Sequence, residues 1–181
     1  MSAHTSPRWV ADLALVGVTF IWGATFVVVK QALDSSSTLL FLALRFSLAA
    51  VVLALLFRRR LGRPSREAWS AGAAVGAALF LGYLFQTLGL RLTTPAKSAF
   101  ITGMSVVLVP VLGALAYRSR PAWNVWVGVA CSATGLYLLA APAGMLRIST
   151  GDTLTFLCAV AFAVHILLLG RFSRRAGAAA L

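Results

Sequence analysis

The residue that most clearly could bind a solute is Arg45, the single charge within the otherwise uncharged stretch 35–57. An arginine inside a membrane-spanning helix costs about 2.5–3.5 kcal/mol on insertion scales, so it normally faces other helices and has a partner. Arg45 can therefore attract a carboxylate or another anion. It can also be a structural residue that donates to backbone carbonyls or to a loop, and the sequence leaves both interpretations open.

A second group of polar side chains could contact an uncharged polar solute. Ser98, Thr102 and Ser105 follow one another after four and three residues, which places their hydroxyls on one face of a helix. Gln86 lies in a neighbouring apolar stretch, where an amide needs a partner. The hydroxyl face could line a cavity, or it could join helices, because an interhelical hydrogen bond contributes about 0.6 kcal/mol.

Two aromatic residues and a histidine complete the candidates for a solute pathway. Tyr83 and Trp22 could form walls for an apolar or ring-bearing solute, although aromatic residues of membrane helices often only pack. His165 could be a proton-sensitive gate or ligand, or it could bond to a neighbouring hydroxyl. Lys97 is expected to extend toward the lipid surface.

Catalysis is not expected from this sequence. Carboxylates are absent from the middle of every uncharged stretch, so no acid–base pair can be formed with His165. Metal-ligand clusters and phosphate-binding loops are also missing, and we expect no cofactor. Cys131 and Cys158 are expected to be small packing residues rather than a disulfide or metal pair.

The elements that must position these side chains are long and apolar. The chain has 181 residues, 60% of them apolar and 11% charged, and its mean hydropathy is +0.91. About a quarter of a soluble domain is charged. The 16 basic and 4 acidic residues give a net charge of +12, but the basic residues lie in short gaps between uncharged stretches and form no nucleic-acid-binding face. The composition excludes a cytosolic enzyme, a secreted disulfide-rich domain and a disordered linker.

Six stretches are long enough to cross a bilayer, because about 20 helical residues span a hydrocarbon core of about 30 Å. We therefore predict an all-α integral membrane protein with six transmembrane helices. The predicted spans lie at about 9–29, 38–57, 68–90, 96–117, 122–141 and 152–172.

The connections between the spans are short and hold most of the charge. Thr94 before Pro95, the serines before Thr38, and Gly151-Asp152 can cap the helices that follow. Eleven lysines and arginines lie on the side of the N-terminus and four on the other side. The basic side, with both termini, is therefore expected in the cytoplasm. Gly72 and Gly76 have the spacing of a close-packing step between membrane helices.

A weak internal repeat relates the first span to the sixth. A shift of 140 residues aligns Asp12 with Asp152 and Trp22 with Phe162. The shift covers five spans, an odd number, so the second copy would enter the membrane in the inverted orientation. Inverted repeats of this kind are typical of secondary transporters.

Several motifs resemble one known family. They are Phe20-Ile21-Trp22-Gly23-Ala24-Thr25-Phe26, Leu44-Arg45-Phe46, Gln86-Thr87-Leu88-Gly89-Leu90, Thr93-Thr94-Pro95-Ala96-Lys97-Ser98, and Val109-Pro110-Val111. With these motifs the chain resembles the EamA branch of the drug/metabolite transporter superfamily over about residues 10–172.

This resemblance implies a carrier in the plasma membrane of a bacterium, built from two five-helix repeats. The chain would hold the first repeat, 9–142, and the first helix of an incomplete second repeat, 152–172, so it looks truncated. The family implies alternating-access transport of small organic metabolites, with export as the expected direction. Amino acids and related neutral or zwitterionic solutes suit spans that lack an embedded glutamate.

An alternative stands beside the transporter interpretation. The chain could be a non-transporting membrane fragment or an assembly subunit that needs the four missing helices. The expected partners are the lipid bilayer, a small-molecule substrate, and the missing C-terminal repeat or another copy of the chain, but no nucleic acid.

Overall fold

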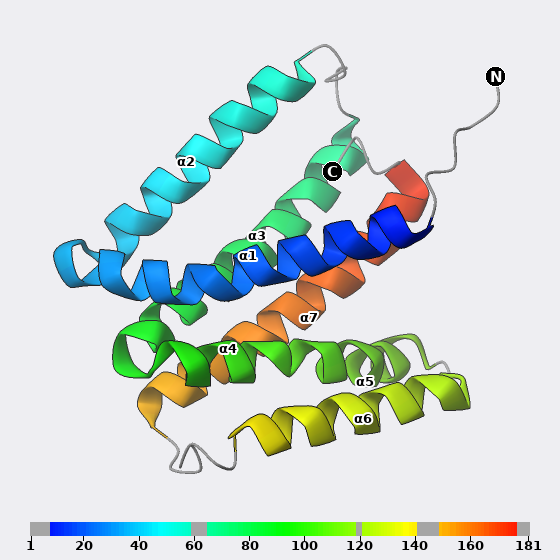
Figure 1. Cartoon of the computed structure of the whole chain (residues 1–181). Coiled ribbons are helices and arrows are strands. Elements are labelled where there is room, and N and C mark those ends of the chain that lie inside the picture. Colours follow the sequence, from blue (N-terminus) through cyan, green and yellow to red (C-terminus); the bar gives the residue numbers. More distant parts are fainter. Residues whose placement is uncertain (1–7, 59–64, 119–120, 141–148, 177–181) are drawn as a thin grey trace.

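The computed structural model describes residues 8–58, 65–118, 121–140 and 149–176, and every element within these ranges is a helix (Figure 1). Met104 separates α4 from α5, which together form one span. The predicted all-α fold of six helical segments is confirmed, and five of the six meet the requirements of a membrane span. The helices are α1 (Arg8–Ser35), α2 (Thr38–Phe57), α3 (Arg66–Leu92), α4 (Pro95–Gly103), α5 (Ser105–Tyr117), α6 (Trp123–Ala140) and α7 (Thr150–Ala176).

Five of the six spans are long and apolar enough to cross a membrane by length and composition, namely Asp12–Ser35, Thr38–Phe57, Arg66–Leu92, Pro95–Tyr117 and Thr150–Ser173. The remaining helix, α6, has 18 residues. Large apolar side chains lie on the outside of the bundle, as Leu44 and Leu48 of α2 show with exposed fractions of 63% and 67%. An apolar exterior of this extent suits lipid and not water, so the chain is a multi-pass membrane protein.

The first helix is longer than the charge pattern predicts. It continues to Ser35, whereas the predicted span ends at 29, just before Lys30. The Lys30 ammonium donates to the carbonyl oxygens of Leu90 and Arg91 at 2.7 and 2.9 Å. Because this charge is satisfied inside the fold, it does not end the helix.

Side-chain caps fix the starts of several helices. Ser37 accepts from the backbone N–H of Leu40 at the start of α2, and Thr94 caps α4, where Pro95 occupies the first helical position. The start of α7 differs from the prediction that Gly151-Asp152 would precede the helix. Ser149 and Asp152 form a reciprocal capping box in which each side chain accepts from the other residue's backbone N–H.

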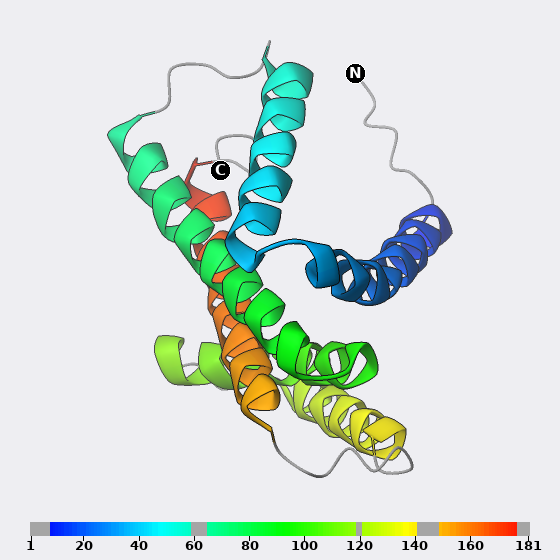
Figure 2. The ribbon, with the colours of Figure 1, turned by 90° about the vertical axis from the view of Figure 1, so that its left-hand side faces the viewer.

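The most extensive helix contact joins α3 and α7, and α7 also packs on α4 and α5 (Figures 1 and 2). The closest approach is at Gly89 of α3 and Gly151 of α7, where a Cβ on Gly89 would lie 2.7 Å from the Gly151 carbonyl oxygen. Gly72 and Gly76 have no described atom within 4 Å of their Cβ positions, so the predicted close-packing step there is wrong.

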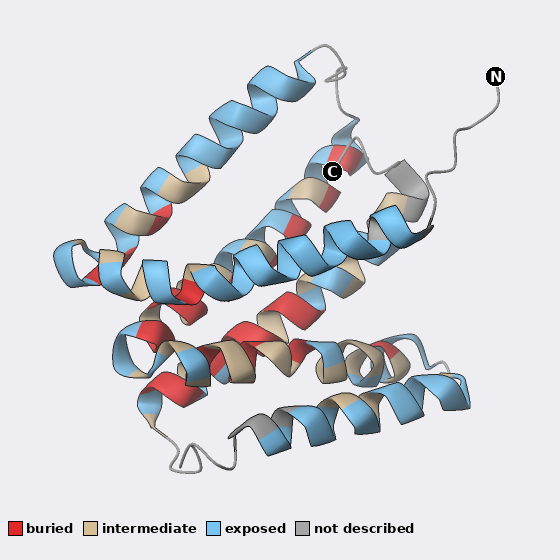
Figure 3. Cartoon of the chain, in the orientation of Figure 1, coloured by how far each residue is buried: buried red, intermediate tan, exposed pale blue. Residues whose placement is uncertain are grey.

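Buried residues gather on α3, α4 and α7, which form the core (Figure 3). In α2 the buried residues are Thr38 and Leu42, and the described side chains of α6 include none that is buried. In α1 only the second half contributes, through Phe26 and Leu33. The helices α2 and α6 therefore lie at the periphery, and the first half of α1 is exposed.

Candidate functional site

Polar side chains are buried together where α3, α4 and α7 meet. Gln86 is 7% exposed, Thr102 1%, and Ser98 and Cys158 are fully buried. The Gln86 Nε2 atom lies 3.5 Å from Thr102 Oγ1, which lies 4.0 Å from Cys158 Sγ. We call Gln86, Ser98, Thr102 and Cys158 the buried polar cluster.

The hydroxyl face of the fourth span points inward. Ser98, Thr102 and Ser105 are all buried, as their spacing in the sequence indicates. The Ser98 hydroxyl has no hydrogen-bond partner among the described residues. A buried polar group without a partner costs about 1–3 kcal/mol, and a contact of 3.5 Å such as Gln86–Thr102 is weak. The buried polar cluster therefore has hydrogen-bonding capacity that the fold leaves unused.

Aromatic rings from four helices form a second group next to this cluster. Tyr83 of α3 makes edge contacts with Phe46 of α2 and Phe162 of α7, at ring-centroid distances of 5.7 and 5.2 Å. Trp22 of α1 lies 6.4 Å from Phe162. The guanidinium of Arg45 lies 4.2 Å above the centroid of the Tyr83 ring. We call Trp22, Phe46, Tyr83 and Phe162 the aromatic cluster.

His165 forms its hydrogen bond with the backbone of α3 and not with a member of either cluster. Its Nδ1 atom is 3.0 Å from the backbone carbonyl oxygen of Val75 in α3. The ring must carry its proton on Nδ1 to donate this bond. His165 thus joins α7 to α3 through the backbone, whereas a neighbouring hydroxyl was the predicted structural partner.

A charged junction closes one end of the bundle. Lys97 of α4 forms an ion pair with Asp152 of α7 at 2.6 Å, and the Thr93 hydroxyl donates to Asp152 at 2.8 Å. The Asp152 side chain is 5% exposed and that of Lys97 14%. The expectation that Lys97 extends to the lipid surface is therefore wrong, because a buried carboxylate holds it between helices.

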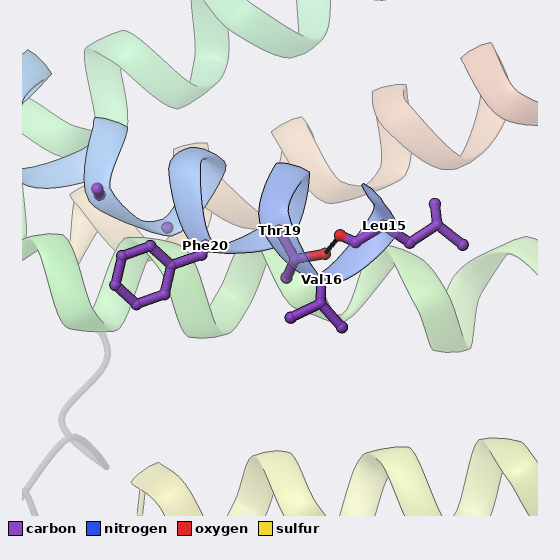
Figure 4. A pocket seen from close by; sticks show the side chains of 6 residues that line it. Leu15, Val16, Thr19 and Phe20 are labelled. Atoms are coloured by element: carbon purple, nitrogen blue, oxygen red, sulfur yellow. Dashed lines mark hydrogen bonds between the residues drawn. The ribbon is translucent and has the colours of Figure 1, made fainter. Parts of the chain in front are cut away.

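An open groove of about 670 Å³ lies along the first half of α1 (Figure 4). The Thr19 hydroxyl, which faces this groove, is already bonded to the Leu15 carbonyl oxygen at 2.8 Å. The groove therefore offers an apolar surface rather than a polar recognition site. It is lined by Leu15, Val16, Thr19, Phe20, Gly23 and Ala24.

Within the described residues no group of three or more His, Cys, Asp or Glu side chains could hold a metal ion. The sequence model of the EamA-like transporter family matches residues 9–141. The chain belongs to this family. The match covers α1 to α6, so it includes Arg45, Tyr83 and the hydroxyl face of the fourth span, but not Phe162.

A curated relative supports the same assignment. An uncharacterized transporter of Archaeoglobus fulgidus is 37% identical over 169 residues, which are 92% of this chain and 51% of the relative. The chain thus spans about half the length of the curated relative that it matches. No solved structure matches the chain.

Six of the eight predicted pathway residues fall into two neighbouring groups of the EamA-like fold. Gln86, Ser98 and Thr102 are buried where α3, α4 and α7 meet, and Trp22, Tyr83 and Arg45 lie at the aromatic cluster. Ser105 is buried at the start of α5. The sequence analysis missed Phe162, which joins Trp22 to Tyr83. The internal repeat contains a signal for this residue, because the shift of 140 residues aligns Phe162 with Trp22.

Proposed function

We propose that this EamA-like chain carries small organic solutes across a membrane by alternating access. The observation that supports this function is the buried polar cluster, which places an amide and hydroxyls with unused hydrogen-bonding capacity inside an apolar bundle. A solute that crosses the membrane must exchange its hydrogen bonds to water for bonds of this kind. A purely structural bundle gains nothing from leaving Ser98 unpaired.

The solutes that suit this site are neutral or zwitterionic, with amino acids as the first class to examine. The buried polar cluster holds no carboxylate, and the nearest acid along α7, Asp152, is already paired with Lys97. Proton-coupled exchange of cations, which relies on an embedded glutamate, therefore lacks its central residue. We propose export across the plasma membrane of a bacterium, with both termini in the cytoplasm.

The alternative function is that of a subunit which transports only with a partner. The exposed first half of α1, with its apolar groove, favours this possibility, since a second helical unit or another copy of the chain could cover it. The greater length of the Archaeoglobus fulgidus relative agrees with such a requirement.

The decisive experiment measures flux in proteoliposomes that contain the purified chain and a panel of radiolabelled amino acids. Gln86→Ala is expected to lower the flux about tenfold, because the loss of one transition-state hydrogen bond of about 1.4 kcal/mol has this effect on a rate. Gln31→Ala is the matched control, since Gln31 is an exposed glutamine of α1. The control variant should transport at the rate of the unmodified chain.

Two results would count against the proposal. Equal flux for Gln86→Ala and Gln31→Ala would remove the buried polar cluster from the pathway. A folded chain that transports none of the panel alone, but does so when a separate five-helix repeat is co-reconstituted, would favour the subunit function instead.

A further inference from the structure

Arg45 is a partly buried charge of α2 that has no charged partner among the described residues. It lies seven residues after Thr38, the first residue of α2, which is about 10 Å along the helix axis. Its side chain is partly buried and its guanidinium lies over the Tyr83 ring. Among the described residues no carboxylate or carbonyl oxygen accepts a hydrogen bond from it. Five N–H donors are thus unmatched at a depth where water is scarce.

None of the acidic side chains in the described residues pairs with Arg45. It contains 4 acidic residues, of which Asp12, Asp34 and Glu67 are exposed near helix ends. The fourth, Asp152, accepts from Lys97, Thr93 and Ser149. The structural interpretation of Arg45 as a donor to backbone carbonyls is also not realised in the described residues. A stacking contact with a ring is worth about 0.5–2 kcal/mol and does not replace hydrogen bonds to an anion.

The surroundings of Arg45 are apolar rings rather than lipid-facing polar groups. The guanidinium lies over the Tyr83 ring, which contacts the rings of Phe46 and Phe162, and Trp22 of α1 contacts Phe162. Trp22 is 40% exposed, so this aromatic cluster is reachable from outside the core. The Tyr83 hydroxyl makes no hydrogen bond within the described part of the chain and can donate beside the guanidinium.

We propose that Arg45 and Tyr83 form a carboxylate-binding subsite for a solute with an apolar body. The guanidinium binds the two carboxylate oxygens side by side, and the Tyr83 hydroxyl donates a further bond. The apolar body packs against Phe46, Phe162 and Trp22. This inference rests on the proposed function and narrows its zwitterionic solutes to those, such as amino acids, that carry a carboxylate and an apolar side group.

The test measures binding and needs no flux. The purified chain is placed in phosphatidylcholine nanodiscs, and saturation-transfer NMR compares phenylacetate with its uncharged analogue phenylacetamide. Phenylacetate should bind at least tenfold more tightly than the amide. Arg45→Gln should remove this preference, Arg45→Lys should retain part of it, and Tyr83→Phe should weaken phenylacetate binding several-fold.

Matched controls separate the subsite from general effects of charge and folding. Arg58→Gln removes an exposed arginine at the end of the same helix, and Tyr137→Phe removes an exposed tyrosine hydroxyl of α6. Both controls should bind phenylacetate like the unmodified chain. Helical circular dichroism and a single elution peak establish that each variant is folded, and Arg45→Lys keeps the test decisive if Arg45→Gln fails to fold.

Three outcomes would overturn the subsite. The first is equal binding of phenylacetate and phenylacetamide, and the second is an undiminished preference for phenylacetate in Arg45→Gln. The third is that, in nanodiscs with phosphatidylglycerol, the chain retains this lipid through Arg45 but does not bind phenylacetate. The last outcome would assign the anion to a lipid phosphate. Arg45-dependent binding without flux would leave the subsite standing and reject the transport function, whereas flux with Arg45-independent binding would reject the subsite alone.

Discussion

The Asp152 side chain has three partners at the charged end of the bundle. Its Oδ2 atom accepts from the Lys97 ammonium and from the Ser149 backbone N–H, both at 2.6 Å. Its Oδ1 atom accepts from the Thr93 hydroxyl. One carboxylate therefore joins the start of α7, the end of α3 and the start of α4. Its negative charge also lies at the N-terminus of α7, where the helix dipole favours an anion.

Asp152→Asn should destabilise the chain by about 3–5 kcal/mol, because it removes the carboxylate charge of the buried ion pair with Lys97. Denaturant unfolding in detergent micelles, followed by circular dichroism, measures this change. Asp34→Asn, which alters an exposed aspartate at the end of α1, should change the unfolding free energy by less than about 0.5 kcal/mol. A double variant, Asp152→Leu with Lys97→Met, should recover much of the loss. A small effect of Asp152→Asn alone would show that the ion pair is not a structural joint.

At the residue scale, the sequence predicted which side chains share a helix face, because local spacing determines this. The inward face of Ser98, Thr102 and Ser105 follows from helical geometry alone. The partners of Arg45 and Lys97 do not, because they lie on other helices. A contact such as Arg45 with Tyr83 depends on the rotation and depth of α2 against α3, and apolar stretches do not encode that register.

At the scale of elements, α1 and α3 end at the same side of the bundle and cap each other. Lys30 of α1 donates to the carbonyl oxygens of Leu90, Arg91 and Thr93 at the end of α3. In return, the Arg91 guanidinium donates to the Leu33 and Ser36 carbonyl oxygens at the end of α1. Each cation thereby satisfies backbone acceptors and offsets the negative end of the other helix dipole. Charge gaps predicted the existence of these helices, but not that a basic residue would lie inside α1.

The crossing of α3 and α7 can be tested with a pair of glycines. Gly89→Ala should destabilise the chain by about 1–3 kcal/mol, because the new Cβ would lie 2.5 Å from Thr155 Oγ1 and 2.7 Å from the Gly151 carbonyl oxygen. Gly76→Ala is the matched control in the same helix and meets no described atom within 4 Å. It should be neutral or stabilising by up to about 1 kcal/mol. Thermal unfolding of both variants in micelles decides the matter, and equal midpoints would contradict the close crossing.

At the scale of the whole molecule, the packing sharpens the charge asymmetry seen in the sequence. Of the four basic residues on the less basic side, Lys30 and Arg91 bind helix carbonyls and Lys97 binds Asp152, while Arg147 lies outside the described residues. On the other side, Arg58, Arg66 and Arg118 are exposed. Free positive charge is therefore concentrated even more on the side of the N-terminus than the ratio of eleven to four indicates.

Composition predicted the six-helix membrane fold because hydropathy and length alone determine which segments can span. The exposure of the first half of α1 could not be predicted, because the sequence of a single apolar helix does not specify which neighbouring helices it contacts.

This asymmetry predicts that both termini lie in the cytoplasm and that the arginines between α2 and α3 maintain this orientation. A green fluorescent protein fused after Leu181 should be fluorescent in bacterial cells, and alkaline phosphatase fused there should be inactive. Replacing Arg58, Arg59, Arg60, Arg63 and Arg66 by glutamine reduces the ratio from eleven against four to six against four. A fraction of the molecules should then insert in the opposite orientation, with gain of phosphatase activity. Lysine at the same five positions preserves the charge and should preserve the orientation. Active phosphatase on the unmodified chain would place the C-terminus outside the cytoplasm and would reject the proposed orientation.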